Sequence, residues 1–166
     1  MDEKSMTIPI YHTKLTVTEA SIDVLGHVNN REYLRWMEEL AIAHSTANGW
    51  SQERYLSEGH VWVAREHWIE YLRPALLDEE LDLFTWIHNI VGSVSLRRYA
   101  VLRRGKLLAN AATEWAHIDF ATKRLSPLPD ALNSAFTVIP ENSELLRENG
   151  ISRPVHWYPV GCAPTP

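Results

Sequence analysis

The segment 21–36, SIDVLGHVNNREYLRW, holds the residues best suited to chemistry. Asp23 supplies a carboxylate, and Gly26 allows a sharp bend or a close approach of the backbone to a ligand. A carboxylate near hydrogen-bond donors is the minimum for acyl transfer, because it can attack a carbonyl or act as a base while the donors stabilise negative charge. Asp23 is equally suited to forming a turn through its own side chain, and the segment leaves both roles open.

The same segment predicts the start of a helix. Asn29 can cap it by accepting from the N–H of Glu32, whose side chain can reach back to the Asn29 amide as a capping box. Val28 and Tyr33 then occupy the hydrophobic-staple positions. Asn30 is the first helical residue, so no helical carbonyl accepts from its N–H. Either water or a loop carbonyl takes that donor, or it holds an anion or a carbonyl oxygen that develops negative charge.

Substrate contacts are expected at this helix entrance. His27 has an ordinary pKa that suits a base, although packing or hydrogen bonding within the loop is the alternative role. The residues expected to touch a substrate are Gly26, His27, Val28, Asn29, Tyr33 and Met37.

The elements that must position these residues follow from hydrophobic periodicity. Apolar residues recur at steps of three and four from Tyr33 to Ala47, which predicts a helix that ends at Asn48 and Gly49. Its further apolar residues predict burial on most sides. Strands are expected at 7–17, 61–72, 81–91, 93–103 and 107–120, the last three as hairpins. The alanines of 107–120 also suit a helix, but the short preceding turn favours a strand.

These elements predict one α+β domain, a five-stranded antiparallel sheet wrapped around one long central helix. We expect this domain to span residues 1–140. Residues 141–166 are expected to form a short helix, in SELLRENG, and a proline-rich C-terminal tail, because seven of the nine prolines follow Ser126. Residues 51–60 are expected to form only a polar connection, and Trp157 and Tyr158 of the tail to dock onto a neighbouring subunit.

Composition excludes several functional classes. A net charge of −5 argues against a protein built to hold nucleic acid, and no apolar run approaches the roughly 20 residues that span a bilayer. One cysteine, Cys162, and an N-terminus without a signal-peptide core predict a cytoplasmic protein. The eight histidines lack metal-ligand spacing, and nucleotide-binding and serine-hydrolase motifs do not occur. Neither a metal nor a cofactor is therefore expected.

The stretch 23–39, DVLGHVNNREYLRWMEE, resembles the signature of the hotdog-fold acyl-CoA thioesterases of the 4-hydroxybenzoyl-CoA thioesterase type. The similarity continues through 63–87, VAREHWIEYLRPALLDEELDLFTWI, and covers roughly residues 7–128 in element order. The resemblance implies the hotdog fold and catalysis by Asp23 and the Asn30 N–H, which would polarise the thioester carbonyl. It also implies a homodimer or homotetramer with active sites at the subunit interface. Ser21 and Leu77 depart from the pattern; the first leaves Asp23 as the only carboxylate of the motif.

The expected activity is hydrolysis of an acyl-CoA to free CoA and a carboxylic acid, with Asp23 as nucleophile or general base. An acyl carrier protein thioesterase and a non-catalytic acyl-CoA-binding hotdog module are the alternatives. The basic residues around the hairpin that ends the 93–103 strand form either a solvated edge or a site for CoA phosphates; they are Arg97, Arg98, Arg103, Arg104 and Lys106. Arg97 and Arg103 are the expected phosphate contacts.

Overall fold

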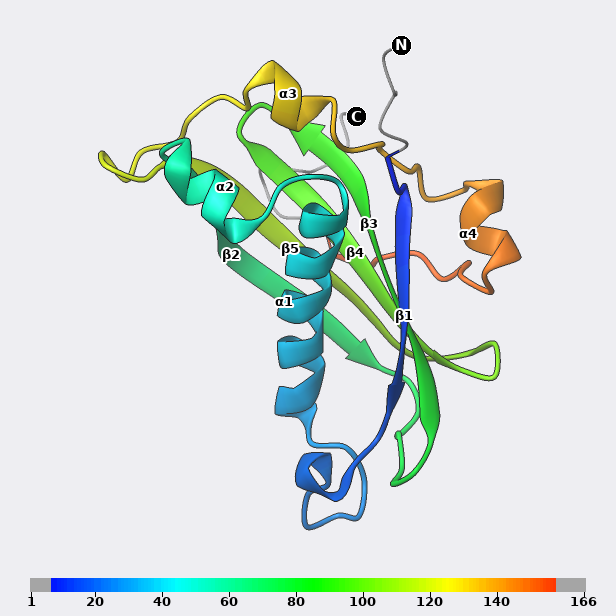
Figure 1. Ribbon diagram of the computed structural model, residues 1–166. Coiled ribbons are helices and arrows are strands. Elements are labelled where there is room, and N and C mark those ends of the chain that lie inside the picture. The colour runs from blue at the N-terminus through cyan, green and yellow to red at the C-terminus, as the bar shows by residue number, and fades with distance from the viewer. Residues whose placement is uncertain (1–6, 158–166) are drawn as a thin grey trace.

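The computed structural model describes residues 7–157. Five antiparallel strands form one sheet, in the order β1-β3-β4-β5-β2, that curves around helix α1 (Figure 1). The strands are β1 (Ile10–Thr16), β2 (His60–Tyr71), β3 (Glu80–Val91), β4 (Val94–Arg103) and β5 (Lys106–Asp119), and α1 spans Asn30–Ala47. This is the predicted α+β architecture.

Tight turns fix the meander of β3, β4 and β5. Gly92 has a φ of 59° between β3 and β4, and Arg104 and Gly105 have φ values of 49° and 76° between β4 and β5. Two consecutive positive φ values give the turn whose twist matches that of a hairpin. The alanine-rich segment forms β5, which pairs with both β4 and β2, so its prediction as a strand is confirmed.

The main core lies between α1 and the concave face of the sheet. Trp36, Met37 and Leu40 of the helix pack in one cluster with Ala109 and Ala111 of β5. Such small residues in the sheet allow large helix side chains to approach the backbone closely. The predicted burial of the helix on most sides is wrong, because many of its residues are exposed, among them the apolar Ile42 at 42%.

The opposite face of the sheet is covered by the chain from Ile139 onward (Figure 1). Ile139, Leu146 and Ile151 pack on Trp86 and its neighbours in β3 and β4. Helix α3 (Asp130–Asn133) precedes this segment and packs Leu132 with Trp50 and Tyr55. The predicted short helix, α4 (Glu144–Glu148), lies within the segment. Part of the chain beyond residue 140 therefore packs against the sheet as part of the folded domain.

Two further short helices have no counterpart among the predicted elements. Helix α2 (Gln52–Ser57) begins with Ser51 as a cap and buries Tyr55 beside Trp50, in the segment predicted as a polar connection. The 3₁₀ helix η1 spans Glu19–Ser21. Trp157 packs within its own chain, against Val155 and its cluster, which leaves its predicted docking on another subunit without support. Tyr158 lies outside the described residues.

Between residues 7 and 157, none of the helices combines the length and the apolar character needed to cross a bilayer.

Candidate active site

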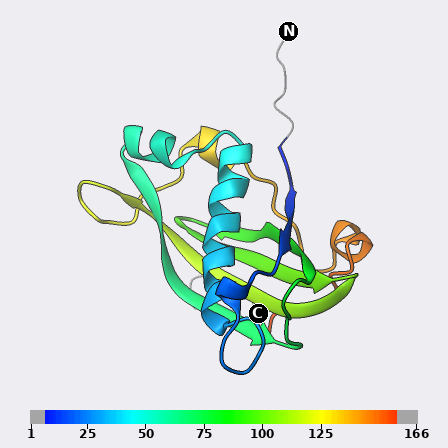
Figure 2. The ribbon, with the colours of Figure 1, turned by 60° about the horizontal axis from the view of Figure 1, so that its bottom comes forward.

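The loop before α1 is a small hairpin. Ile22 and Val28 form an antiparallel bridge, and the Asp23 N–H donates to the His27 carbonyl oxygen at 3.0 Å. Gly26 has a φ of 82° at the tip, so the predicted sharp bend is confirmed. Figure 2 shows this loop projecting beyond the sheet at the N-terminal end of α1. Its backbone pairing holds Asp23 beside the helix entrance.

Asn29 caps α1, as predicted, but without a capping box. Its Oδ1 accepts from the Arg31 N–H at 3.0 Å. The Asn29 N–H donates to the Ser21 carbonyl oxygen at 2.8 Å, and the Glu32 carboxylate instead pairs with Arg35 at 2.6 Å. The capping-box prediction is wrong because the loop backbone already occupies the amide that Glu32 would have bonded.

No helical carbonyl accepts from the Asn30 N–H, as the sequence predicts. Within residues 7–157 it donates no hydrogen bond, and Asn30 is exposed at the positive end of an 18-residue helix. The Asn30 carbonyl oxygen accepts from the Tyr71 hydroxyl at 3.3 Å, which ties the end of β2 to the start of α1. A donor of this kind can receive a carbonyl oxygen from a ligand.

The Asp23 carboxylate takes part in the turn through one of its two oxygens. Its Oδ1 accepts from the Leu25 N–H at 2.9 Å, which is the turn-forming role. Its Oδ2 accepts no hydrogen bond within the described part of the chain, and Asp23 is half-buried. Val24 and Leu25, next to it at the tip, are exposed apolar residues. The turn fixes the carboxylate without engaging both of its oxygens.

Tyr33 and Met37 lie on the face of α1 that packs against the sheet. Both are buried in the main core, and the Tyr33 ring packs edge-on against Tyr71 with centroids 5.1 Å apart. Burial raises the pKa of Tyr33 to about 12, with Glu79 and Arg103 nearby as smaller influences. Their predicted contact with substrate has no support in this packing. Val28, also buried, contributes to the same core.

The predicted basic cluster is not one surface. Arg97 and Arg98 are both buried, on opposite faces of β4, because successive side chains of a strand alternate. Arg97 faces α1, whereas Arg98 faces the C-terminal segment and pairs with Glu141 at 3.4 Å. Arg97 therefore does not lie on a solvated hairpin, where its contact with a CoA phosphate is predicted.

Arg103 remains at the surface end of β4. It donates to both carboxylate oxygens of Glu79, at 2.8 and 2.7 Å. Arg104 and Lys106 are exposed in the adjacent turn. The positive charge available to a phosphate here lies mainly on these two residues, because the Glu79 carboxylate already binds the Arg103 guanidinium.

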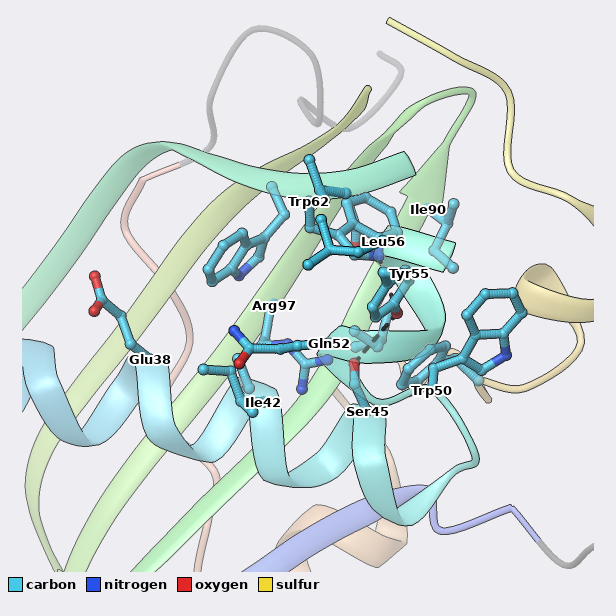
Figure 3. Close-up of a pocket in the computed structure, with 16 residues that line it drawn as sticks. Glu38, Ile42, Ser45, Trp50, Gln52, Tyr55, Leu56, Trp62, Ile90 and Arg97 are labelled. Carbon is cyan, nitrogen blue, oxygen red and sulfur yellow. Dashed lines mark hydrogen bonds between the residues drawn. The ribbon is translucent and has the colours of Figure 1, made fainter. Parts of the chain in front are cut away.

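A cavity of about 390 Å³ lies beside the C-terminal half of α1 (Figure 3). Its walls come from α1, α2 and the concave face of the sheet, and they include Trp50, Tyr55, Trp62, Trp115 and Phe136. Its α1 residues run from Glu38 to Ser45, roughly 12–22 Å along the helix from Asn30 at 1.5 Å per residue. The cavity is thus separate from Asp23. The sequence does not locate this cavity, since its tryptophans suit a core or a subunit interface as well as a groove.

His44 connects Arg97, on the wall of this cavity, to the chain before β1. Nη1 of Arg97 donates to Nδ1 of His44 at 2.8 Å, and Nε2 of His44 lies 2.6 Å from the Ile8 carbonyl oxygen. A guanidinium only donates and a carbonyl only accepts, so His44 is neutral with its proton on Nε2. Burial, and then the charge of Arg97, lowers the pKa of His44 to about 4.

Acidification is expected to destabilise the protein through His44. The pKa of this side chain is ordinarily 6.5 and falls to about 4 in the folded protein, so the unfolded chain takes up the proton first. The stability from this group is complete above pH 6.5 and is lost as the pH falls to about 4. At about 1.4 kcal/mol per pKa unit, the loss is on the order of 3 kcal/mol.

Denaturant unfolding at several pH values measures this effect. Burial also lowers the pKa values of His67, His88 and His117, so the comparison is with His44→Gln, whose amide keeps one donor and one acceptor. The variant should lose less stability between pH 6.5 and pH 4. Identical pH slopes for the two proteins would contradict the prediction.

Within residues 7–157, no group of three or more His, Cys, Asp or Glu side chains is arranged to hold a metal ion. The candidate site consists of a carboxylate and a backbone amide. Its chemistry is that of attack on a carbonyl with electrostatic stabilisation of the oxygen.

Comparison with solved structures identifies similar folds. A probable thioesterase from Bartonella henselae is 25% identical, with 72% of this chain and 99% of that chain covered and a TM-score of 0.67. A 1,4-dihydroxy-2-naphthoyl-CoA thioesterase from Synechocystis is 20% identical, with coverage of 76% and 94% and a TM-score of 0.70. A hypothetical protein from Staphylococcus aureus, in complex with CoA, is 14% identical, with coverage of 94% and 93% and a TM-score of 0.73.

No curated protein matches the chain in sequence. Residues 17–136, however, match the family described as the Thioesterase-like superfamily. The matched region runs from the end of β1 to the end of the cavity wall at Phe136, and it includes the loop, α1 and the whole meander. The chain therefore belongs to the Thioesterase-like superfamily and has its hotdog fold.

Proposed function

We propose that this protein hydrolyses acyl-CoA thioesters to free CoA and a carboxylic acid, at the entrance of α1. The observation that carries the proposal is the Asn30 N–H, which has no acceptor within residues 7–157 and lies at the end of a hairpin that holds Asp23. Membership of the Thioesterase-like superfamily supports the reaction class. The neighbour named as a 1,4-dihydroxy-2-naphthoyl-CoA thioesterase, and the neighbour in complex with CoA, support CoA as the carrier.

In the proposed mechanism the thioester carbonyl oxygen accepts from the Asn30 N–H. One such donor is worth about 10²–10³ in rate, roughly 2.7–4 kcal/mol. Asp23 then either attacks the carbonyl carbon, expelling CoA thiolate and forming a mixed anhydride that water hydrolyses, or it deprotonates a water that attacks directly. In both routes the helix dipole stabilises the oxyanion, and the thiolate leaves and takes up a proton.

His27 is the alternative base. It pairs with Asp23 across the hairpin through its backbone, and its side chain is half-buried. Gly26, His27 and Asn29 lie on the loop between Asp23 and Asn30 and are proposed substrate contacts. Arg103 is proposed to meet the CoA phosphates together with its exposed neighbours, which requires the phosphates to share it with Glu79.

We also propose a homodimer, or a homotetramer built from it. Strand β2 is an edge of the sheet and spans 12 residues, and residues 64–67 in its middle are exposed. A long open edge favours pairing with a second strand, and the exposed Val24 and Leu25 at the loop tip offer apolar area to a partner. Active sites would then lie at the interface.

The mass in solution tests this arrangement. Light scattering after size-exclusion chromatography should give about two or four times the chain mass of 19.1 kDa. A single peak at the mass of one chain, across a dilution series, would contradict it.

A thiol-release assay over a panel of acyl-CoA substrates tests the activity. Turnover that saturates with an aromatic or aliphatic acyl-CoA is the expected result. Turnover confined to acyl carrier protein thioesters would favour the carrier-protein alternative, which the net charge of −5 makes less suitable because the carrier is itself acidic. CoA binding without turnover of any thioester would instead identify a binding module.

A further inference from the structure

Arg97 brings a positive charge into the cavity beside α1. Both protons of its Nη1 are used, by Nδ1 of His44 at 2.8 Å and by Oγ1 of Thr85 at 3.1 Å. Across residues 7–157, neither Nε nor Nη2 has an acceptor, and no carboxylate pairs with the guanidinium. Nε and Nη2 form the side of a guanidinium that binds a carboxylate through two parallel hydrogen bonds.

The burial of Arg97 makes this lack of a counter-ion costly. The residue is only 4% exposed, and burial lowers its pKa, although a guanidinium remains protonated at neutral pH. Its strand neighbour Arg98 is equally buried, but it pairs with Glu141 and donates to Asn110 at 2.7 Å. A buried charge is normally paired in this way, so the contrast points to an anion that Arg97 receives from outside its own fold.

The lining of the cavity indicates that the rest of the ligand that carries this anion is apolar. At about 390 Å³ it falls within the range of small-molecule sites, and five of its wall residues are aromatic. Figure 3 shows Arg97 extending from the sheet toward α1 among the lining residues, with Ile42 and Gln52 nearby. Glu38, the acidic residue of the lining, is exposed on α1. Flat aromatic walls favour a rigid ring, which loses less conformational entropy on binding than an alkyl chain.

We propose that this cavity is a binding site for an apolar monocarboxylate, aromatic rather than alkyl, whose carboxylate is held side-on by Nε and Nη2 of Arg97. The site lies roughly 12–22 Å along α1 from Asn30. It is therefore distinct from the proposed reaction centre at Asp23 of the same chain.

Isothermal titration calorimetry of the unmodified protein tests the proposal with matched ligands. We expect 2-naphthoate to bind about 30-fold or more tightly than 2-naphthamide, because the amide keeps the ring and loses the charge. Octanoate and octanamide form the alkyl pair, and octanoate should bind more weakly than 2-naphthoate. Equal affinity for acid and amide would overturn the carboxylate site, and tighter binding of octanoate would overturn the aromatic preference.

Variants then locate the site. Arg97→Gln should weaken binding of 2-naphthoate by about 30-fold or more and leave 2-naphthamide nearly unchanged, and Arg97→Lys should give an intermediate loss. Arg104→Gln is the matched control, because it removes the same charge from an exposed turn, and it should change affinity by less than about twofold. Loss of binding in the control to the same extent as in Arg97→Gln would contradict a specific role of Arg97.

Two measurements keep the proposal testable if the Arg97 variants fail to fold. In the unmodified protein, the indole N–H NMR signals of Trp50, Trp62 and Trp115 should shift when 2-naphthoate binds, since all three line the cavity. Unchanged signals at saturation would overturn the location. Asp23→Asn should bind 2-naphthoate as the unmodified protein does, so failure of the proposed hydrolysis and failure of this site give different results.

Discussion

Asp23→Asn is expected to lower kcat for acyl-CoA hydrolysis by about 10²–10⁴-fold if Asp23 is the general base, and by more if it is the nucleophile. The substitution removes the charge and the basicity but keeps the shape. Its Oδ1 can still accept from the Leu25 N–H, so the turn before α1 should persist. We therefore expect little change in melting temperature and in the affinity for CoA. Steady-state thiol release and a thermal melt measure both effects.

Asp78→Asn is the matched control for this variant. Asp78 is exposed in the loop between β2 and β3, and its φ of 66° suits asparagine as well as aspartate. It removes the same charge and should retain nearly full activity. Near-normal turnover by Asp23→Asn would remove Asp23 from the mechanism and leave His27 as the alternative base.

Asn30→Pro is expected to lower kcat by about 10²–10³-fold, because proline has no backbone N–H to donate to the thioester oxygen. Proline is tolerated at the first position of a helix, where the amide has no helical acceptor. The preceding residue, Asn29, already has a φ of −63° and a ψ of 138°, which a following proline requires. The helix should therefore form normally, and circular dichroism and a thermal melt would verify this.

Asn30→Ala separates the amide from the side chain. It keeps the backbone N–H and removes the carboxamide, so it should turn over close to the rate of the unmodified protein. A large loss in Asn30→Ala would assign the effect to the side chain. Full activity in Asn30→Pro would show that the carbonyl oxygen is stabilised elsewhere.

The sequence by itself determined the elements whose signals are local. Periodicity along residues 33–47 predicts α1, and the turn residues near Gly92 and Gly105 predict the meander, because both patterns act between neighbours in the chain. Asn29 is predictable as a cap, and Gly26 as a bend, for the same reason. One short loop separates Asp23 from Asn30, which is why the sequence alone suggests the site that we propose for them.

The tertiary structure decided what depends on residues far apart in the chain. The Ser21 carbonyl replaces Glu32 in bonding the Asn29 amide, which only the folded loop can bring about. The C-terminal segment has the prolines of a tail, although its apolar residues cover the outer face of the sheet once that face exists.

Arg97 shows the difference most clearly. In the sequence it stands beside Arg98 in one basic run, which predicts a single surface for both. In the fold, the alternation of β4 sends Arg98 to a carboxylate from residue 141 and Arg97 to a cavity formed by α1, α2 and the sheet. Neither the counter-ion nor the cavity is a property of neighbouring residues, so each arises only when distant segments pack together.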